Sequence, residues 1–295
     1  MGRSWLLETD SKSIKPSCSA DPATVDGWPA DLSAITHRTQ RRHAGTVCVM
    51  PIELGEALPP EGRNAFIDAF GDEARKLLED RAVEVELEVQ QPLSAEEEGV
   101  DGLYFPLSGL MCRLVSLPEG STVKVSIVGR EGMTGTSALF DTSLSAFRTV
   151  VQLPGKALFL SRADAIRLLA LPGVGPIVSR YLLLLIREAS LTAACNRAHH
   201  ARQRLARWLL LIADRAGRDA FALTHESLSA MLGVRRESIT LAVSELRRAG
   251  GIESGRGTVA ITDRSELKKQ SCSCYPAITA SYARFLRSEI FQNYA

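Results

Sequence analysis

The sequence predicts an α+β protein in which an antiparallel β-roll, or jelly roll, precedes a long helix and a C-terminal winged helix-turn-helix. Three observations predict this order. Short apolar or alternating segments separated by turns rich in Gly and Pro occupy residues 83–161. The stretch 177–197 is apolar on more than one side. Two short amphipathic helical patterns, separated by a glycine, lie within 223–248.

Composition fits an ordinary globular protein. The chain has 295 residues, a length that is enough for two modest domains. Of these residues 45% are hydrophobic and 23% are charged, as in ordinary globular proteins. No window approaches eighteen uninterrupted apolar residues, and the N-terminal residues lack a basic region leading into an apolar core. The six cysteines are scattered rather than arranged as a disulfide framework. We therefore expect a cytoplasmic protein with free thiols, no membrane span and no secretory signal.

The β-roll is predicted from its strands. A helix is expected over Gly62–Glu79. Val83–Val89 alternates strictly, which places Val83, Val85, Leu87 and Val89 inward. The remaining predicted elements are strands at Gly102–Pro106, Leu110–Leu117, Thr122–Val128, Arg148–Leu153 and Lys156–Ser161, then a short helix at Arg162–Leu169.

The long helix is predicted over Ile177–Arg197. Since it is apolar on every side near its middle, it must bury two faces. One face can cover the roll, and the other is expected to meet its copy in a second subunit. The alternative is a helix buried completely within one subunit. The residues expected at the dimer contact are Ile177, Tyr181, Leu184, Leu185, Leu191 and Cys195.

A helix-turn-helix follows a predicted scaffold helix, Arg202–Ala216. Thr224 is placed as an N-cap, and Gly233 ends the first helix because glycine tolerates the left-handed conformation. The second helix begins near Arg235. Gly-rich residues 254–257 then form the tip of a predicted hairpin, which makes the module winged. The residues expected to be buried in the second helix are Ile239, Ala242, Val243 and Leu246.

Charge on this module favours duplex DNA as its partner. Residues 197–256 hold eleven Arg and six acids, so the balance is 11 − 6 = +5 in a chain of net charge +1. A polar, basic second helix suits the major groove, and a basic wing tip can reach phosphate. The residues expected to contact DNA are Thr224, Arg235, Arg236, Glu237, Ser238, Thr240, Leu241, Ser244 and Arg256.

The run from Leu232 to Thr240, LGVRRESIT, resembles the recognition segment of the Crp/Fnr family of bacterial transcription regulators. The resemblance implies a homodimer on an inverted-repeat site, with the long helix as its seam, and RNA polymerase as a further partner. Arg236 and Glu237 match family positions that meet bases and backbone. Leu241 stands where the family usually has another Arg, which puts the usual half-site in doubt. The alternative function is a signalling or interaction module without DNA binding. No catalytic motif indicates an enzyme.

The predicted effector loop is degenerate. Family members that bind cAMP hold the ribose with Gly-Glu and the phosphate with an Arg a few residues later. The matching loop here contains Gly132, Gly135, Thr136 and Ser137, with Thr136 in place of the Glu. The nearest Arg, Arg148, comes a few residues late. We therefore expect no tight cAMP binding and predict no cofactor.

Metal binding is also considered and not expected. An iron–sulfur cluster needs clustered thiolates, and Cys18 and Cys48 are isolated. His37 and His43 lack a haem motif. The pair Cys272-x-Cys274 could bind a metal or act in redox chemistry, but no second pair lies nearby, and His199-His200 falls on a different predicted element.

The predicted division of the chain is therefore a disordered extension at 1–60, a roll at 61–170, a dimerisation helix at 171–198, a winged helix-turn-helix at 199–268 and a helical tail at 269–295.

Overall fold

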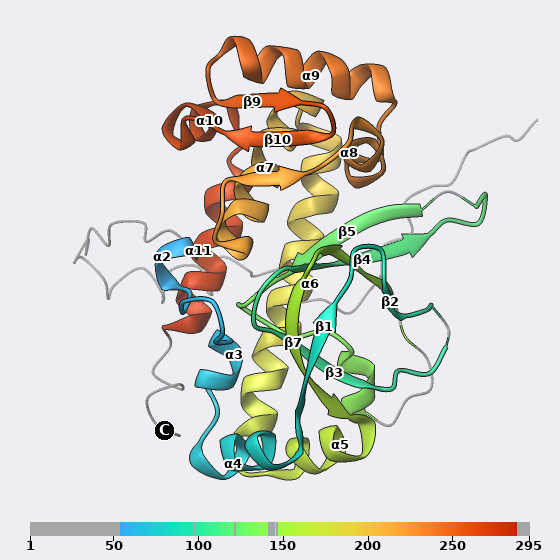
Figure 1. Ribbon diagram of the computed structural model, residues 1–295, viewed down its shortest axis with the longest axis vertical. Coiled ribbons are helices and arrows are strands. Elements are labelled where there is room, and N and C mark those ends of the chain that lie inside the picture. The colour runs from blue at the N-terminus through green and yellow to red at the C-terminus, as the bar shows by residue number, and fades with distance from the viewer. Residues whose placement is uncertain (1–53, 97, 121, 141–144, 146, 288–295) are drawn as a thin grey trace, which may run out of the picture. The chain divides into compact units, whose positions relative to one another are not determined.

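The computed structural model describes residues 54–287, apart from 97, 121, 141–144 and 146 (Figure 1). The chain divides into two units, 1–48 and 49–295, and the described residues belong to the second. Most of the predicted extension therefore lies outside the described residues. Its last part differs from the prediction, since Leu54–Ala57 forms helix α2 and Leu54 is fully buried. The folded part thus begins before residue 61.

Two helices replace the single helix predicted over Gly62–Glu79. They are α3 (Ala65–Asp68) and α4 (Asp72–Arg81). Asn64 caps α3, because its Oδ1 accepts hydrogen bonds from the amides of Phe66 and Ile67. Its side-chain amide donates to two distant carbonyls, each at 2.9 Å. The chain leaves the helical path before Gly71, the extended N-cap of α4, which divides the predicted helix.

The roll consists of two antiparallel sheets. One has the order β1-β7-β3 and the other β2-β6-β4-β5. Three strands have the predicted bounds, namely β3 (Gly102–Pro106), β5 (Thr122–Val128) and β6 (Arg148–Leu153). The others are β1 (Val83–Leu87), β2 (Pro92–Ser94), β4 (Leu110–Ser116) and β7 (Gly155–Ser161). Strand β2 is absent from the prediction. The 3₁₀ turn η1 (Thr136–Phe140) and helix α5 (Arg162–Ala170) complete the roll.

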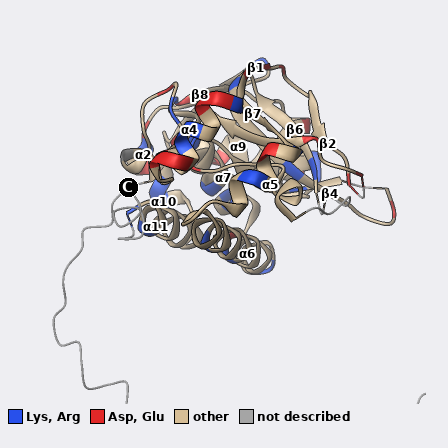
Figure 2. Cartoon of the chain, turned by 90° about the horizontal axis from the view of Figure 1, so that it is seen from below, with Lys and Arg blue, Asp and Glu red and all other residues tan. Residues whose placement is uncertain are grey.

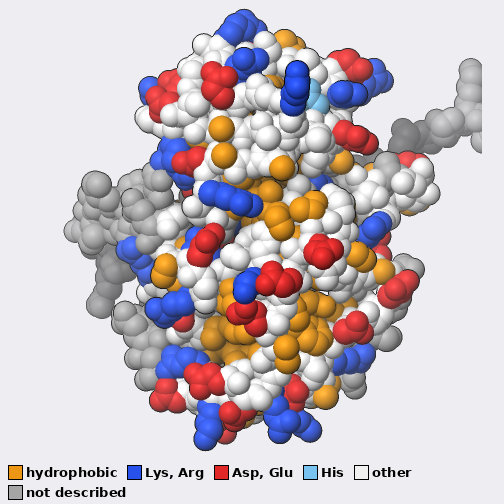
Figure 3. Space-filling model, in the orientation of Figure 1, with side chains coloured by type: hydrophobic (Ala, Val, Ile, Leu, Met, Phe, Trp, Pro, Cys, Tyr) orange, Lys and Arg blue, Asp and Glu red, His pale blue; other side chains and the backbone are white. Residues whose placement is uncertain are grey.

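The inward set predicted for the first strand is wrong at its ends. Val83 is 61% exposed and Val89 is 54% exposed, whereas Leu87 is buried. Strand β1 lies at the edge of its sheet, so it has one neighbour only, and the strand ends at Leu87. Figure 3 shows hydrophobic side chains gathered over β1, β7 and β3. Between the two sheets lies an apolar cluster made of Leu87, Leu93, Met111, Val128, Val151 and Ala157.

Helix α6 (Val174–Ala198) begins after Gly173, whose φ of 79° is left-handed. Helix α11 (Cys274–Leu286) lies beside it, as the view in Figure 2 shows. Aromatic rings join the roll to both helices, because the ring of Tyr181 lies 4.8 Å from that of Phe66 and 6.0 Å from that of Phe285. The C-terminal segment is therefore part of the core, not an appended tail.

The dimer contacts predicted on this helix need correction. Ile177, Tyr181, Leu184 and Cys195 are buried inside their own subunit, and Leu185 and Leu191 are half-buried. The exposed apolar residues are instead Leu183, at 65%, and Ile186, at 63%. Periodicity could not decide which apolar residues face outward, since the middle of the helix is apolar on every side and a distant segment, α11, covers part of it.

The remaining elements form the C-terminal module. They are α7 (Ala201–Ala216), β8 (Ala220–Ala222), α8 (His225–Leu232), α9 (Arg236–Arg248), β9 (Ile252–Gly255), β10 (Thr258–Ile261) and α10 (Arg264–Gln270). The three strands pair in the order β8-β10-β9, and β8 was not predicted.

Among the described helices no single one is long and apolar enough to cross a membrane. The bent pair α5 and α6 meets the requirement of length and composition only when the two are joined.

Candidate nucleic-acid interface

The turn between α8 and α9 is built from local signals. Thr224 Oγ1 accepts a hydrogen bond from the amide of Ser227 at 3.1 Å, which caps the start of α8. Gly233 ends α8 with a φ of 61°, a conformation that a side chain would strain. Arg235 is the extended N-cap of α9. The predicted helix-turn-helix therefore has the predicted cap residues.

One face of α9 is fixed inside the module. Its buried residues are the four that the apolar spacing predicts, Ile239, Ala242, Val243 and Leu246. They place α9 against α7, so the opposite face is directed away from the module. In Figure 1, α9 is the helix at the top of the view, and in Figure 3 blue Lys and Arg side chains lie at this edge.

The predicted DNA contacts lie on this free face. Arg235, Arg236 and Glu237 are exposed at the start of α9. The two arginines form no ion pair within the part of the chain that the structure describes. Further along, Thr240, Leu241 and Ser244 are also exposed, and Ser238 is half-buried. Thr224 is exposed as well, although its hydroxyl already caps α8.

His225 lies beside the predicted DNA contacts, and the sequence analysis did not include it. It is the first residue of α8, and its Nδ1 lies 3.2 Å from Oγ1 of Thr240 on α9. The same hydroxyl is 3.1 Å from the carbonyl oxygen of Arg236. Its position directly after the predicted cap could have signalled it, because helix N-termini commonly face phosphate.

The wing stands next to α8. Arg256 is exposed at the turn between β9 and β10, and Gly257 beside it has a φ of 74°. A Cβ on Gly257 would lie 3.7 Å from the methyl carbon of Thr224, so the turn and the start of α8 are neighbours. Arg256 makes no ion pair with any described residue and is free to contact phosphate.

The surface charge of the module is smaller than the sequence count indicates. Three of the eleven arginines, Arg204, Arg207 and Arg215, are buried, as is Asp214 among the six acids. Eight arginines and five acids remain, so the balance is 8 − 5 = +3. The buried arginines have structural partners instead of a role in contacting DNA.

Arg215 lies at the centre of a buried charged network. Its Nε is 2.9 Å from Glu131 in the loop after β5, and its Nη2 is 3.1 Å from Glu188 on α6. The hydroxyl of Tyr282 on α11 donates to Glu188 at 2.6 Å. Burial alone would lower the pKa of Arg215, but the two carboxylates outweigh burial and raise it. The network joins the roll, α6, α11 and the C-terminal module.

The roll also contacts α8, the first helix of the helix-turn-helix. Lys124 on β5 donates to the hydroxyl of Ser227 on α8 at 3.3 Å. Lys124 is only 7% exposed, and burial lowers its pKa. A Cβ on Gly233 would lie 3.7 Å from the side chain of Val123 on the same strand. The contact uses α8 and the turn, so the outer face of α9 stays free.

The predicted effector loop is packed closely. A Cβ on Gly132 would lie 2.2 Å from Oη of Tyr181, and one on Gly135 would lie 2.1 Å from the carbonyl oxygen of Gly102. Arg113 is buried and donates to the carbonyl of Met133 at 2.8 Å. Thr136 and Ser137 are half-buried at the start of η1. The loop glycines therefore accommodate neighbouring protein groups.

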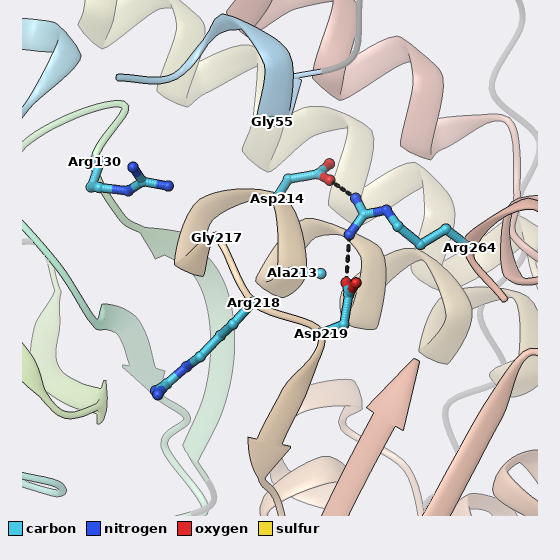
Figure 4. Close-up of a pocket in the computed structure, with 8 residues that line it drawn as sticks. All are labelled: Gly55, Arg130, Ala213, Asp214, Gly217, Arg218, Asp219 and Arg264. Carbon is cyan, nitrogen blue, oxygen red and sulfur yellow. Dashed lines mark hydrogen bonds and ion pairs between the residues drawn. The ribbon is translucent and has the colours of Figure 1, made fainter. Parts of the chain in front are cut away.

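A separate cleft of about 290 Å³ lies beside the C-terminal end of α7 (Figure 4). Arg130, Arg218 and Arg264 line it together with Asp214 and Asp219. Arg264 contacts both acids, the second at 2.7 Å. Figure 4 shows Arg264 paired with Asp214 and Asp219, and we assign the cleft no ligand.

Comparison with known proteins supports a regulator of transcription. Residues 203–270 match the Crp-like helix-turn-helix domain. The chain is 24% identical over 180 residues to the cyclic AMP receptor protein of Thermus thermophilus, covering 61% of this chain and 83% of that protein.

Solved structures share the fold. A Crp/Fnr-family regulator from Eubacterium rectale matches with a TM-score of 0.56 at 16% identity, over 68% of this chain and 94% of its own. A CRP/FNR-family regulator from Thermus thermophilus matches with a TM-score of 0.54 at 22% identity, over 64% and 98%.

The exposed recognition helix, the wing and the Crp-like domain together define a DNA-binding transcription regulator. Residues 203–270 match the Crp-like helix-turn-helix domain, and the chain as a whole is similar in fold to regulators of the Crp/Fnr family.

Proposed function

We propose that the regulator acts as a homodimer on an inverted-repeat DNA site. The exposed face of α9 reads bases in the major groove, and the wing holds phosphate. One observation carries this proposal. Burial of Ile239, Ala242, Val243 and Leu246 leaves Arg235 and Arg236 free and exposed at the start of α9. The N-terminal residues of a recognition helix are those that contact base edges.

Each exposed group on α9 has a distinct chemical use. Arg236 can donate two hydrogen bonds to O6 and N7 of guanine, and Glu237 can accept from the amino group of cytosine. Leu241 is 59% exposed and can contact a thymine methyl group, but it cannot donate. Arg256 on the wing can pair with phosphate regardless of sequence.

The dimer contact is proposed at the exposed apolar residues of α6, Leu183 and Ile186. They lie three residues apart, so they share one face of the helix, and that face points away from the subunit. Two copies would bury four large apolar side chains, which is the usual driving force for such an interface.

We propose that the roll does not bind cAMP, although a relative of this chain carries that nucleotide in its name. Supporting this, the loop glycines pack against Tyr181 and Gly102, and the space between the sheets holds an apolar cluster. Phosphate binding needs free cationic or amide donors. The buried Arg113 is already engaged by Met133.

Selection of binding sites from random duplexes tests the base reading. We expect the wild-type chain to enrich an inverted repeat. Arg236→Ala should cost about 1–3 kcal/mol in binding and lose preference at one base pair per half-site. Arg248→Ala is the matched control, since Arg248 is exposed on the same helix but in its last turn. It should keep every base preference. If Arg236→Ala retains the wild-type preference throughout, α9 is not the reader.

A further inference from the structure

Four side chains of the kinds that can bind a metal, from two distant segments, meet beside the DNA-binding module. Cys195 and His199 come from the end of α6, and Cys272 and Cys274 from the start of α11. The sulfurs of Cys195 and Cys272 are 3.5 Å apart. The sulfur of Cys274 lies 3.7 Å from Nδ1 of His199. All four potential ligand atoms lie within 4.8 Å of one another.

Local structure explains how each segment presents two ligands. Cys195 lies in the last turn of α6, and His199 is the C-cap four residues later, so the two side chains share one face of the helix end. Cys272 and Cys274 flank Ser273, the N-cap of α11. The amide of Tyr275 donates to the carbonyl of Cys272 at 3.0 Å and closes a turn around them. The sequence separates the pairs, but the packing of α11 on α6 joins them.

The spacing suits a single ion. With metal–sulfur bonds of about 2.3 Å, a tetrahedral site has sulfur–sulfur edges of about 3.8 Å. The sulfur–sulfur distance of 3.5 Å and the sulfur–nitrogen distance of 3.7 Å are close to such edges. A cluster with several irons would need its ligands farther apart. A disulfide between Cys195 and Cys272 would use two of the four groups. It would not explain why Cys274 and His199 lie beside them.

Burial and charge also favour an ion with thiolate ligands. The three cysteines are between 0% and 7% exposed and form an apolar cluster of their own. The fully buried guanidinium of Arg207 places a positive charge close to all three cysteines.

Arg207 provides a second, independent observation. Its Nη1 donates to Thr192 on α6 at 3.2 Å, one turn before Cys195. Its Nε and Nη2 have no hydrogen-bond partner among the described residues. A divalent ion with three thiolates and one neutral imidazole carries a net charge of −1, which one buried guanidinium balances. Without a bound ion and its negatively charged ligands, the two unpartnered nitrogens of this buried cation would lack compensation, which is costly.

We infer that Cys195, His199, Cys272 and Cys274 bind one Zn²⁺ in a closed tetrahedral site that ties the start of α11 to the end of α6. Soft thiolates with one imidazole in tetrahedral geometry select zinc among the common divalent ions. Four protein ligands leave no open position, so the ion is structural. The site lies where α6 gives way to α7, and the ion therefore fixes the joint that connects α6 to the DNA-binding module.

Metal content and cobalt spectroscopy test the inference. The full chain is purified under reducing conditions from zinc-supplemented cells, and its zinc is measured per chain. The apoprotein is then titrated with Co²⁺ alone. We expect one zinc per chain, and an intense visible Co²⁺ spectrum typical of tetrahedral geometry, with sulfur-to-metal charge transfer from three thiolates. This spectrum is read on the wild type, so it does not depend on whether a variant folds.

Variants identify the ligands. Cys195→Ser, Cys272→Ser, Cys274→Ser and His199→Ala should each weaken zinc binding by more than about 100-fold, because even residues that only support metal ligands cost 10–100-fold. Cys112→Ala and His200→Ala are the matched controls. Cys112 is a buried free thiol on β4, and His200 is the exposed neighbour of His199. Both should bind zinc like the wild type.

Three results would overturn the inference. The first is reduced, folded protein that holds no stoichiometric zinc and gives the weak spectrum of six-coordinate Co²⁺. The second is equal zinc affinity in the ligand variants and the controls. The third is a Cys195–Cys272 disulfide, found by mass spectrometry after thiols are trapped in intact cells. All of these readouts are independent of DNA binding.

Discussion

At the scale of single residues, the buried arginines show how charge is divided between structure and recognition. Arg215 pairs with Glu131 and Glu188, while Arg235 and Arg236 remain free on the surface. Sequence counts treat these arginines alike. Only burial separates the cations that hold the module in place from those that can contact DNA.

Breaking the buried network should destabilise the protein. Glu188→Gln keeps the shape of the side chain but removes its charge, leaving Arg215 with Glu131 as its remaining carboxylate. Loss of one partner of a buried pair typically costs about 3–5 kcal/mol. Urea denaturation should show this as a lower midpoint. Asp68→Asn is the control, because the Arg63–Asp68 pair is exposed and such pairs contribute roughly 0–1 kcal/mol. Equal midpoints for the two variants would refute a structural role for the network.

Several site residues could be predicted from sequence because their signals are local. Thr224, Gly233 and Arg236 follow from capping and helical spacing within thirty residues of chain. The Cys195 and Cys272 juxtaposition could not, since it depends on α11 packing along α6 and their separation is 77 residues. The local signals available were the Cys272-x-Cys274 pair and the i, i+4 spacing of Cys195 and His199.

At the scale of elements, the strands and the long helix differ in how far their own sequences determine their bounds and their buried faces. β3, β5 and β6 match their predicted bounds, because turns delimit them and cross-strand pairing follows the apolar pattern. β1 is an edge strand, so its alternation did not decide burial. The middle of α6 is apolar on every side, and tertiary packing alone determines which of its faces is free.

Charging the free face of α6 should dissociate the dimer. Ile186→Glu places two charges in the proposed contact, and each lost isoleucine contact is worth about 1.5–3 kcal/mol. We therefore expect dimer affinity to fall by roughly 100-fold or more. Sedimentation at micromolar concentration measures it. Ile166→Glu on α5 is the control, because Ile166 is also an exposed apolar residue on a helix, at 39%. The proposal is wrong if the wild type sediments as a monomer or if Ile186→Glu remains dimeric.

At the scale of the whole folded unit, residues 49–295, contacts connect the roll to the DNA-binding module. Lys124 reaches Ser227, and the Arg215 network joins the roll to α6, α7 and α11. These contacts hold α8 and the turn, while α9 and the wing stay outside them. A dimer built through α6 would consequently present two α9 helices in a fixed relation, set by the two-fold axis.

Operator spacing tests that fixed relation. Two recognition helices related by a two-fold axis should enter the major groove at half-sites about 10 base pairs, or ~34 Å, apart. Adding five base pairs between the half-sites turns one to the opposite side of the duplex. The dimer can then engage only one half-site, so the affinity gained from simultaneous binding, about 10²–10⁴-fold, is lost. Fluorescence anisotropy at constant salt measures this, since phosphate contacts make affinity depend on ionic strength. Substituting the central base pairs without changing their number is the control and should leave most of the affinity. A direct repeat, or a single half-site, bound as tightly as the inverted repeat would show that the two α9 helices do not act as a symmetric pair.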